Sequence, residues 1–358
     1  MRVIYLKVLY YSEPKQEEIR GGVGNVALFL PKALSREVGV IYYPRITSNR
    51  YPLKLIDIYK KLIIGDFDII HFNISPVWIN GSYVILKCAK LAQIPTIMNI
   101  HAIVQYEHTQ DPGVSPLSGY QLRSQLNASG LVDRIVVNSE YMKKIVPIYY
   151  GVRRDKVIVI PNGINIEDFS NRNSKQKLDG EPAIINIGRF SFLKGTPTLI
   201  EAVAKVRTKL PTAKLHIIGK VAPEYLQLSR SPSVEEYTVF HGEIKEHTNV
   251  LRYLKGSDIL VSASRHEGFG IVILEAMASG VPVIASNIES FQELISNGTN
   301  GLLFPVGNAD ALSEAIVTLY ENRLLRKELV FQGLETAKTY SWTDVASKYI
   351  SLYQSLHK

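Results

Sequence analysis

The chain has 358 residues and carries 41 lysine and arginine residues against 33 aspartate and glutamate residues, a formal net charge of +8 at pH 7. Hydrophobic residues make up 46% of it and charged residues 21%, which excludes a disordered chain, and the length predicts two domains. A single cysteine, Cys88, excludes an internal disulfide and a cysteine-based metal site, and it fits a reducing compartment.

The opening residues MRVIYLKVLYYSEP indicate a buried strand rather than a secretory leader, because no charged start, apolar core and cleavage site follow one another. The apolar stretch 268–286 contains Glu275 and Pro282, so a membrane-spanning helix is not predicted. We therefore expect a cytoplasmic protein. The basic balance favours anionic partners such as phosphates or acidic lipid, or it reflects a merely soluble basic protein; no nucleic-acid motif is present, so no nucleic-acid partner is expected.

Short apolar, β-branched runs recur along the chain and predict strands, with helical stretches such as 23–39 and 195–211 between them. The predicted strands are 2–10, 39–43, 68–73, 95–100, 134–138 and 156–160, then 183–188, 213–219, 237–242, 258–264, 281–286 and 301–304. Most are apolar on both faces, as in a parallel sheet covered on both sides. The pattern predicts a doubly wound α/β fold.

A polar segment, DFSNRNSKQKLDGEP at 168–182, separates the two sets of six strands and has the composition of a linker. We expect an N-terminal Rossmann-like domain at 1–170, a linker at 171–182 and a C-terminal Rossmann-like domain at 183–340. The tail, 341–358, has helical spacing and could belong to either domain. Ligands of such sheets bind at the carboxyl ends of the strands, so two domains facing across a cleft would share one site.

Three segments before the second domain deserve a chemical interpretation. In IRGGVGNVALFL, Gly22 and Gly24 match the G-x-G-x-x-A pattern of dinucleotide sites, but they come about ten residues after the strand. A loop whose amides reach a phosphate or an acceptor fits better.

His101 directly follows a strand and is either a site residue or a hydrogen-bonded loop histidine. Asp66 and Asp68 in GDFD read as a strand-entry turn rather than a metal-binding pair; no metal-ligand spacing and no nucleophile elbow occur.

The segment GRFSFLKG, at 188–195, follows the first strand of the second domain. Arg189 and Lys194 would lie in its strand-to-helix loop, where two cations can neutralise a departing diphosphate as Mg²⁺ does in other transferases. The alternative is two solvated surface cations.

The segment RHEGFGIVILEAMASG, at 265–280, follows the strand 258–264 and predicts a glycine turn and then a helix. The N–H groups of Phe269, Gly270 and Ile271 would point out of the helix start and form an anion site for a phosphate.

Two glutamates, Glu267 and Glu275, lie on either side of that anion site. Carboxylates accept hydrogen bonds from hydroxyl groups, so a ligand with hydroxyls on both sides of a phosphate would satisfy both. A nucleotide sugar has this order of groups. Alternatively, Glu275 is a helix-surface residue and Glu267 only complements the helix dipole.

These motifs together resemble the retaining GT-B glycosyltransferases of family 4, also called glycosyl transferases group 1. The resemblance rests on EGFGIVILEAMASGVPVIAS, GRFSFLKG, VIPNGIN (159–165), GGVG, His101 and SWTDVASKYISLY. It implies that Glu267 contacts the donor sugar, Glu275 the ribose, and Arg189 with Lys194 the diphosphate. It also implies that the final helix returns to pack on the N-domain.

The resemblance assigns three further contacts. Phe269, Gly270 and Ile271 would bind phosphate through their N–H groups, Ile244 in HGEI would touch the nucleobase, and His101 would lie near the reactive face of the sugar. The chain departs from the family at Lys220, where an acidic or small residue is common, and in the loop 101–113.

We therefore expect a retaining glycosyltransferase that moves a sugar from a nucleoside-diphosphate sugar to a hydroxyl of a glycan or lipid-linked acceptor, without a metal or other cofactor. The basic charge and Tyr42, Tyr43, Tyr51 and Tyr59 would allow peripheral contact with the inner face of a membrane. The alternatives are a nucleotide-sugar epimerase of the same fold, an NAD(P)-dependent oxidoreductase and a two-lobed sugar-binding protein.

Overall fold

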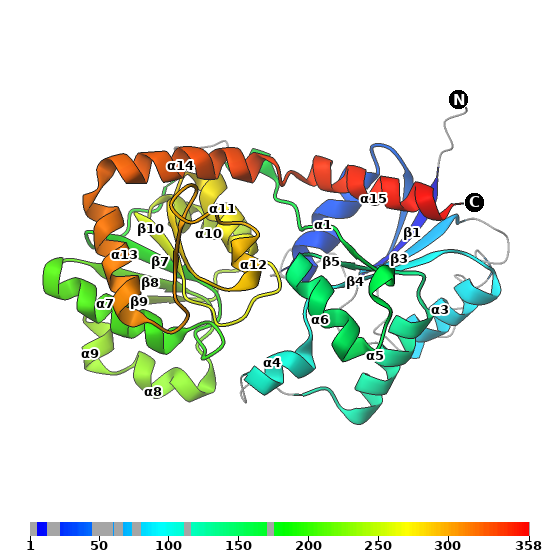
Figure 1. The fold of residues 1–358 in the computed structure, drawn as a ribbon, viewed down its shortest axis with the longest axis horizontal. Helices are drawn as coiled ribbons and strands as arrows, with labels where there is room; N and C mark the ends of the chain where they lie inside the picture. Colours follow the sequence, from blue (N-terminus) through cyan, green and yellow to red (C-terminus); the bar gives the residue numbers. More distant parts are fainter. Residues whose placement is uncertain are drawn as a thin grey trace. The chain divides into compact units, whose positions relative to one another are not determined.

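The computed structural model describes residues 6–12, 22–44, 60, 67–73, 80–110, 116–169 and 175–357, and the chain divides into two compact units. Unit 1 comprises residues 1–109, 114–163 and 342–358; unit 2 comprises 110–113 and 164–341. Each unit contains one six-stranded parallel sheet flanked by helices (Figure 1). This confirms the predicted doubly wound α/β class. The division falls after residue 163, whereas the sequence placed the linker at 171–182.

Unit 1 has the strand order β2-β1-β3-β4-β5-β6, with every pair parallel. Its strands are β1 (Lys7–Ser12), β2 (Gly39–Pro44), β3 (Ile69–Asn73), β4 (Thr96–Ile100), β5 (Arg134–Val137) and β6 (Val157–Val159). Its helices are α1 (Gly22–Leu34), α3 (Asn80–Leu91), α4 (Val104–Gln110), α5 (Gly119–Leu131), α6 (Glu140–Tyr150) and α15 (Trp342–Leu356).

Helices cover both faces of this sheet, which explains its continuously apolar strands. The helices α3, α5 and α6 pack on one face, around Phe72, Met98 and Ile135. The helices α1 and α15 lie side by side on the other face, around Val8 and Ile97 (Figure 1). The last helix of the chain is therefore part of the core of unit 1.

One expectation about unit 1 is wrong. Gly22 and Gly24 were expected in a loop before the helix, but α1 begins at Gly22, so both glycines lie in its first turn. Gly21 lies outside the described residues.

Unit 2 has the strand order β12-β11-β10-β7-β8-β9, again all parallel. Its strands are β7 (Ala183–Ile187), β8 (Lys214–Ile218), β9 (Thr238–Gly242), β10 (Ile259–Ser262), β11 (Val283–Ser286) and β12 (Leu302–Phe304). Its longer helices are α7 (Thr196–Lys209), α10 (His247–Lys255), α11 (Ile271–Ser279), α13 (Ala309–Glu321) and α14 (Arg323–Lys338). Short helices are α8 (Leu226–Ser229), α9 (Pro232–Glu235) and α12 (Glu289–Gln292).

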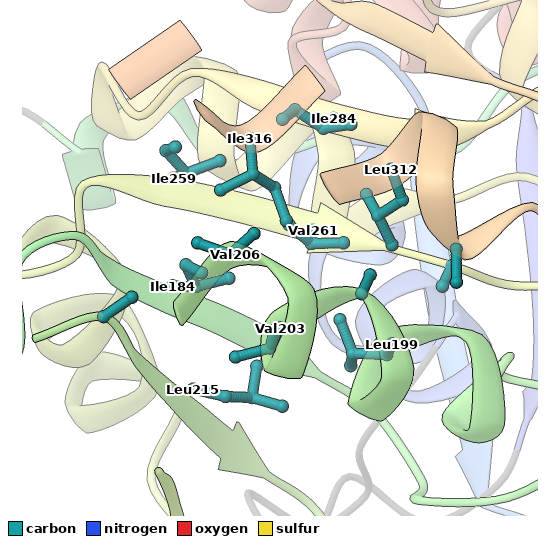
Figure 2. Packing of buried hydrophobic residues seen from close by; sticks show 14 of the residues in the cluster. Ile184, Leu199, Val203, Val206, Leu215, Ile259, Val261, Ile284, Leu312 and Ile316 are labelled. Carbon is teal, nitrogen blue, oxygen red and sulfur yellow. The ribbon is translucent and has the colours of Figure 1, made fainter. Parts of the chain in front are cut away.

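The sheet of unit 2 is also buried on both faces. Figure 2 shows one side, where Leu199 and Val203 of α7 and Ile316 of α13 pack against the strands. The helices α10 and α11 pack on the opposite side. Burying an aliphatic side chain of this size contributes about 1.5–3 kcal/mol, so the two layers hold the strand ends in fixed positions. Among the helices of the described residues, none has the length and apolar character needed to cross a membrane.

Candidate active site

Two loops of unit 2 meet at the carboxyl end of its sheet. Residues 188–195 connect β7 to α7, and residues 263–270 connect β10 to α11; β7 and β10 are neighbours. The N–H of Arg265 donates to the carbonyl of Leu193 at 2.9 Å. Gly195 has a left-handed conformation (φ 72°), and a Cβ there would lie 1.9 Å from the carbonyl oxygen of Ala263. The loops are therefore held together backbone to backbone.

The helix α11 starts at this junction, as the sequence predicted. Its N-cap, Gly270, has a φ of 98° and no side chain that caps the helix. A Cβ at Gly270 would lie 2.6 Å from the ring of Phe291, so only glycine fits. The helix start thus presents backbone amides and the positive end of the helix dipole, which together favour an anion.

A cation and a carboxylate form an ion pair between the two loops of this junction. Lys194 Nζ is 2.5 Å from Oε1 of Glu267, and the Ser264 hydroxyl donates to the same oxygen at 3.0 Å. The Ser264 carbonyl in turn accepts from the hydroxyl of Ser286. Both bonds to Glu267 end on one oxygen, so Oε2 remains able to accept from a ligand hydroxyl.

The structure brings Lys194, but not Arg189, into contact with Glu267. Arg189 is exposed, between Gly188 and the buried Phe190. The N–H of Phe190 donates to the carbonyl of Lys220 at 2.8 Å, which fixes the backbone next to Arg189. Its guanidinium forms no ion pair with another described residue. Lys220, the residue at which the chain departs from the family pattern, forms an ion pair with Glu243, with Nζ 3.1 Å from the carboxylate.

His266, which the sequence analysis did not single out, lies buried beside this pair. Burial lowers the pKa of its imidazole to about 4, with Glu267 opposing the shift and Lys194 adding to it. The imidazole is therefore neutral near pH 7. His266 therefore adds no charge to the pair formed by Lys194 and Glu267.

Glu275 is 5% exposed, which excludes its alternative as a helix-surface residue. Its Oε1 lies 2.9 Å from Nε2 of His247, the first residue of α10. Close to this pair, burial raises the pKa of Asp168, whose Oδ1 accepts from Asn165 at 2.9 Å; the His247 imidazole opposes that shift. His247 could not be found from the sequence because it lies 28 residues from Glu275 in a segment without a motif.

Three further predicted contacts lie in unit 2. Ile244 follows β9 by two residues and is half-buried against the core. The ring of Phe269 is buried and lies near Tyr340, so this residue has only its backbone to offer a ligand. Ile271 is the first residue of α11 and half-buried.

His101 is in unit 1, directly after β4. Its Nε2 lies 2.7 Å from Oδ1 of Asn73, and its Nδ1 is buried without a hydrogen-bond partner among the described residues. Burial lowers the pKa of this imidazole to about 4. Asn138, directly after the neighbouring strand β5, has a buried Oδ1 that is likewise unpaired within the described ranges. Neither Asn73 nor Asn138 was predicted as a site residue, because the only signal of each is a polar residue at the end of an apolar strand.

Two other predictions can be placed. Within the described residues there is no group of three or more histidine, cysteine, aspartate and glutamate side chains that could hold a metal ion. Tyr42 stacks on Tyr10, with 6.2 Å between the ring centroids. Tyr42 therefore belongs to the packing of unit 1 rather than to an exposed aromatic surface. The side chain of Tyr43, and Tyr51 and Tyr59, lie outside the described residues.

Comparison with protein families matches nearly the whole chain in two parts. Residues 8–168 match the family described as Glycosyltransferase Family 4, and residues 167–335 match the family described as Glycosyl transferases group 1.

Named relatives and solved structures agree with this match. The phosphatidyl-myo-inositol mannosyltransferase of Mycobacterium leprae is 28% identical over 303 residues, 83% of this chain and 76% of the relative. The D-inositol 3-phosphate glycosyltransferase of Corynebacterium glutamicum is 26% identical, covering 80% of this chain and 72% of the relative. The fold is similar to that of Anabaena HepE in complex with UDP-glucose, with a TM-score of 0.74, 18% identity and coverage of 98% and 100%.

Proposed function

Because the chain belongs to the glycosyl transferases group 1 family, the retaining family 4 glycosyltransferases of the GT-B fold, we propose that it moves a hexosyl group from a nucleoside-diphosphate sugar to a hydroxyl of a lipid-linked acceptor. Glycosyl transfer from a nucleotide sugar is the activity of that family. The hexosyl class, the acceptor and the role of each residue are the proposal.

The observation that carries the proposal is the contact of Lys194 with Glu267 at the start of α11. The donor diphosphate binds the amides of Phe269, Gly270 and Ile271, where the helix dipole favours negative charge. Lys194 lies next to that position, and Arg189 lies in the same loop. The donor sugar follows the diphosphate, and its hydroxyls donate to Glu267.

Bond cleavage at the anomeric carbon places new negative charge on the departing diphosphate. Fixed donors aimed at developing charge stabilise a transition state more than any other single device. Lys194 supplies a positive charge for this purpose and Arg189 supplies a second. No divalent ion is needed in this scheme, because the two cations and the amides stabilise the negative charge that a metal ion would otherwise stabilise.

Retention does not require a covalent intermediate on a carboxylate in this site. A double displacement needs two carboxyl groups that flank the scissile bond, one as nucleophile. Glu267 is paired with Lys194, and Glu275 is buried against His247. We therefore favour front-face substitution, in which the acceptor attacks from the side of the leaving diphosphate and that group assists the deprotonation of the acceptor.

The nucleoside contacts lie on the other side of the helix start. Glu275 is held by His247 and accepts from the ribose hydroxyls. Ile244, after β9, packs against the base. A carboxylate that is already oriented loses little entropy when the ribose binds, which favours affinity.

The distribution of charge supports a lipid-linked acceptor at an anionic surface. Unit 1 has 22 lysine and arginine residues against 12 aspartate and glutamate residues, a net charge of +10. Unit 2 has 19 against 21, a net charge of −2. Basic surface adds about 1 kcal/mol of membrane attraction for each lysine or arginine near anionic lipid. Phosphatidyl-myo-inositol mannosyltransferases, among the relatives, are named for a lipid acceptor.

The test has two steps. A thermal-shift screen with UDP, GDP, ADP and their sugars identifies the donor. A ligand that binds only the folded state raises the midpoint temperature of unfolding. Transfer of the labelled sugar is then measured with liposomes of neutral or anionic lipid that carry a hydroxylated lipid acceptor. Acceptor-dependent release of the diphosphate supports the proposal. Conversion of the donor sugar without any acceptor would instead indicate an epimerase.

A further inference from the structure

Three polar residues lie at the carboxyl ends of three adjacent strands in unit 1. Ser12 ends β1, Asn73 ends β3, and His101 follows β4. Asn73 Nδ2 donates to Ser12 Oγ at 3.0 Å, and His101 Nε2 lies 2.7 Å from Asn73 Oδ1. Ser12 and Asn73 are fully buried and are register partners of the sheet. Asn73 is therefore held on both sides.

A second layer of polar residues lies behind these three, on the face covered by α15. Asn99 Nδ2 donates to Asn73 Oδ1 at 3.2 Å, and Asn99 Oδ1 lies 3.0 Å from Nε2 of His71. His71 Nδ1 lies 2.7 Å from the hydroxyl of Tyr353, and the Tyr349 hydroxyl donates to Asn99 Oδ1 at 3.2 Å. The network thus runs from α15 to His101.

With the amides of Asn73 and Asn99 oriented as in the structure, the position of the ring hydrogen on each histidine follows from its hydrogen-bond partners. A neutral imidazole has one N–H and one acceptor nitrogen. Because Asn99 Oδ1 only accepts, His71 carries its hydrogen on Nε2, and the Tyr353 hydroxyl donates to its Nδ1. The Asn99 amide then donates to Asn73 Oδ1, which also only accepts. His101 must therefore carry its hydrogen on Nε2.

We propose that Asn73 is a positioning residue for sugar transfer, which fixes His101 in the Nε2–H tautomer and so turns Nδ1 into a hydrogen-bond acceptor for a substrate hydroxyl. The proposal rests on the proposed function only for the identity of that hydroxyl. Nδ1 is buried and has no partner among the described residues, so a ligand hydroxyl is the group that would satisfy it. The hydrogen bond of one ring nitrogen commonly sets the role of the other.

The neutral form of both histidines follows from their surroundings. Burial lowers the pKa of His71 to about 3 and that of His101 to about 4. Neither imidazole is then charged near pH 7, so Nδ1 of His101 keeps its lone pair. His101 orients a hydroxyl in this scheme and exchanges no proton with it.

The first measurement needs only the wild-type protein. Long-range ¹H–¹⁵N correlation spectra of the full, ¹⁵N-labelled chain distinguish a protonated from an unprotonated ring nitrogen, and His101→Gln assigns the signals. We expect His101 to show a hydrogen on Nε2 and none on Nδ1. A hydrogen on Nδ1 overturns the proposal, and this outcome does not depend on activity.

The variant Asn73→Leu removes the acceptor at nearly constant volume. We expect the His101 signals to move toward a mixture of the two tautomers, and kcat/KM to fall by about 10- to 100-fold, the range found when the orienting partner of a metal-bound histidine is removed. Unchanged His101 signals in a folded Asn73→Leu protein would overturn the proposal. If this variant does not fold, the wild-type spectrum still decides.

The matched control is Gln125→Leu. Gln125 is a buried amide on α5, on the opposite face of the same sheet, and donates to the Tyr150 hydroxyl at 2.8 Å. We expect it to lose stability as Asn73→Leu does while the His101 signals and kcat/KM stay within about twofold of wild type. A comparable loss of activity in both variants contradicts a positioning role. A protein with the expected tautomer that transfers no sugar supports the role of Asn73 and counts against the proposed function.

Discussion

Lys194 and Glu267, 73 residues apart in the sequence, lie with Nζ 2.5 Å from Oε1 in loops that follow two neighbouring strands. Their side chains are 29% and 23% exposed, so the pair lies in a partly solvated environment. An ion pair on the open surface contributes about 0–1 kcal/mol because solvent screens it, and solvent screens this pair only in part. In the proposed site, a diphosphate beside Lys194 would replace Glu267 as its counter-charge and would leave Glu267 for a sugar hydroxyl.

Lys194→Ala should lower kcat by on the order of a hundredfold or more, because the charge on the leaving diphosphate loses a fixed counter-charge. Arg189→Ala should also lower it strongly. The measurement is steady-state sugar transfer at saturating donor. Lys205→Ala is the matched control, since Lys205 on α7 pairs with Asp310 and Glu201 away from the loop junction. Unchanged turnover in the Lys194 and Arg189 variants would contradict the proposed diphosphate site.

Gly195→Ala should disrupt the loop junction. The new Cβ would lie 1.9 Å from the backbone oxygen of Ala263, and this oxygen cannot move without displacing the loop that carries Glu267. Gly298→Ala is the control: its φ of 77° imposes the same left-handed strain, but no atom lies within 4 Å. We expect Gly298→Ala to cost about 1–2 kcal/mol with activity retained, and Gly195→Ala to cost more and abolish transfer. If the two variants lost the same unfolding free energy and the same activity, the loop junction would not be tightly packed.

His247→Ala should weaken nucleoside diphosphate binding by about tenfold, because Glu275 loses the partner that orients its carboxylate. Isothermal titration calorimetry measures the dissociation constant directly. Asn249→Ala changes a half-buried residue of the same helix, which donates to Glu246, and should leave the constant unchanged. If His247→Ala binds as tightly as wild type, Glu275 does not contact the ligand or needs no orientation.

Acid should destabilise unit 1 through its buried histidines. An unfolded histidine binds a proton near pH 6.5, whereas folded His71 does so only near pH 3, so the unfolded state binds more protons between these values. The contribution of His71 is fully present above pH 6.5 and falls by about 1.4 kcal/mol for each pH unit below it. We expect the free energy of unfolding, measured by denaturant titration, to fall between pH 7.5 and pH 5. The fall should be about 2 kcal/mol smaller in His71→Gln than in wild type. The same pH effect in both proteins would refute this.

Chelation should leave transfer unaffected. Lys194, Arg189 and the amides of α11 take the place of a divalent ion in the proposed site. The measurement is turnover after dialysis against EDTA, with and without added Mn²⁺. Loss of activity that Mn²⁺ restores would contradict the metal-independent scheme.

The sequence predicted the fold well because strand signals were local. Every predicted run of apolar residues that lies in the described ranges became a strand. Parallel strands buried on both faces carry this signal in their own composition. The start of α1 was misplaced because a glycine can open a helix as well as precede it, and the local sequence does not distinguish the two.

The site was only partly predictable, and the difference is physical. The loop motifs around Lys194 and Glu267 follow strand ends, so their meeting could be expected from the topology of a parallel sheet. The partners His247 and Asn73 could not, since each reaches its target through tertiary packing between segments without a motif. Which of the two cations pairs with Glu267 also depends on side-chain geometry: Lys194 does and Arg189 does not.

The most direct test of the account measures how much of the nucleotide affinity comes from the diphosphate. The dissociation constants of UDP, GDP and ADP are compared with those of their nucleosides, in wild type and in Arg189→Ala/Lys194→Ala. The account predicts that a cognate nucleoside diphosphate binds wild type far more tightly than its nucleoside, and that this advantage largely disappears in the double variant while nucleoside binding persists. An advantage of the same size in both proteins would contradict it.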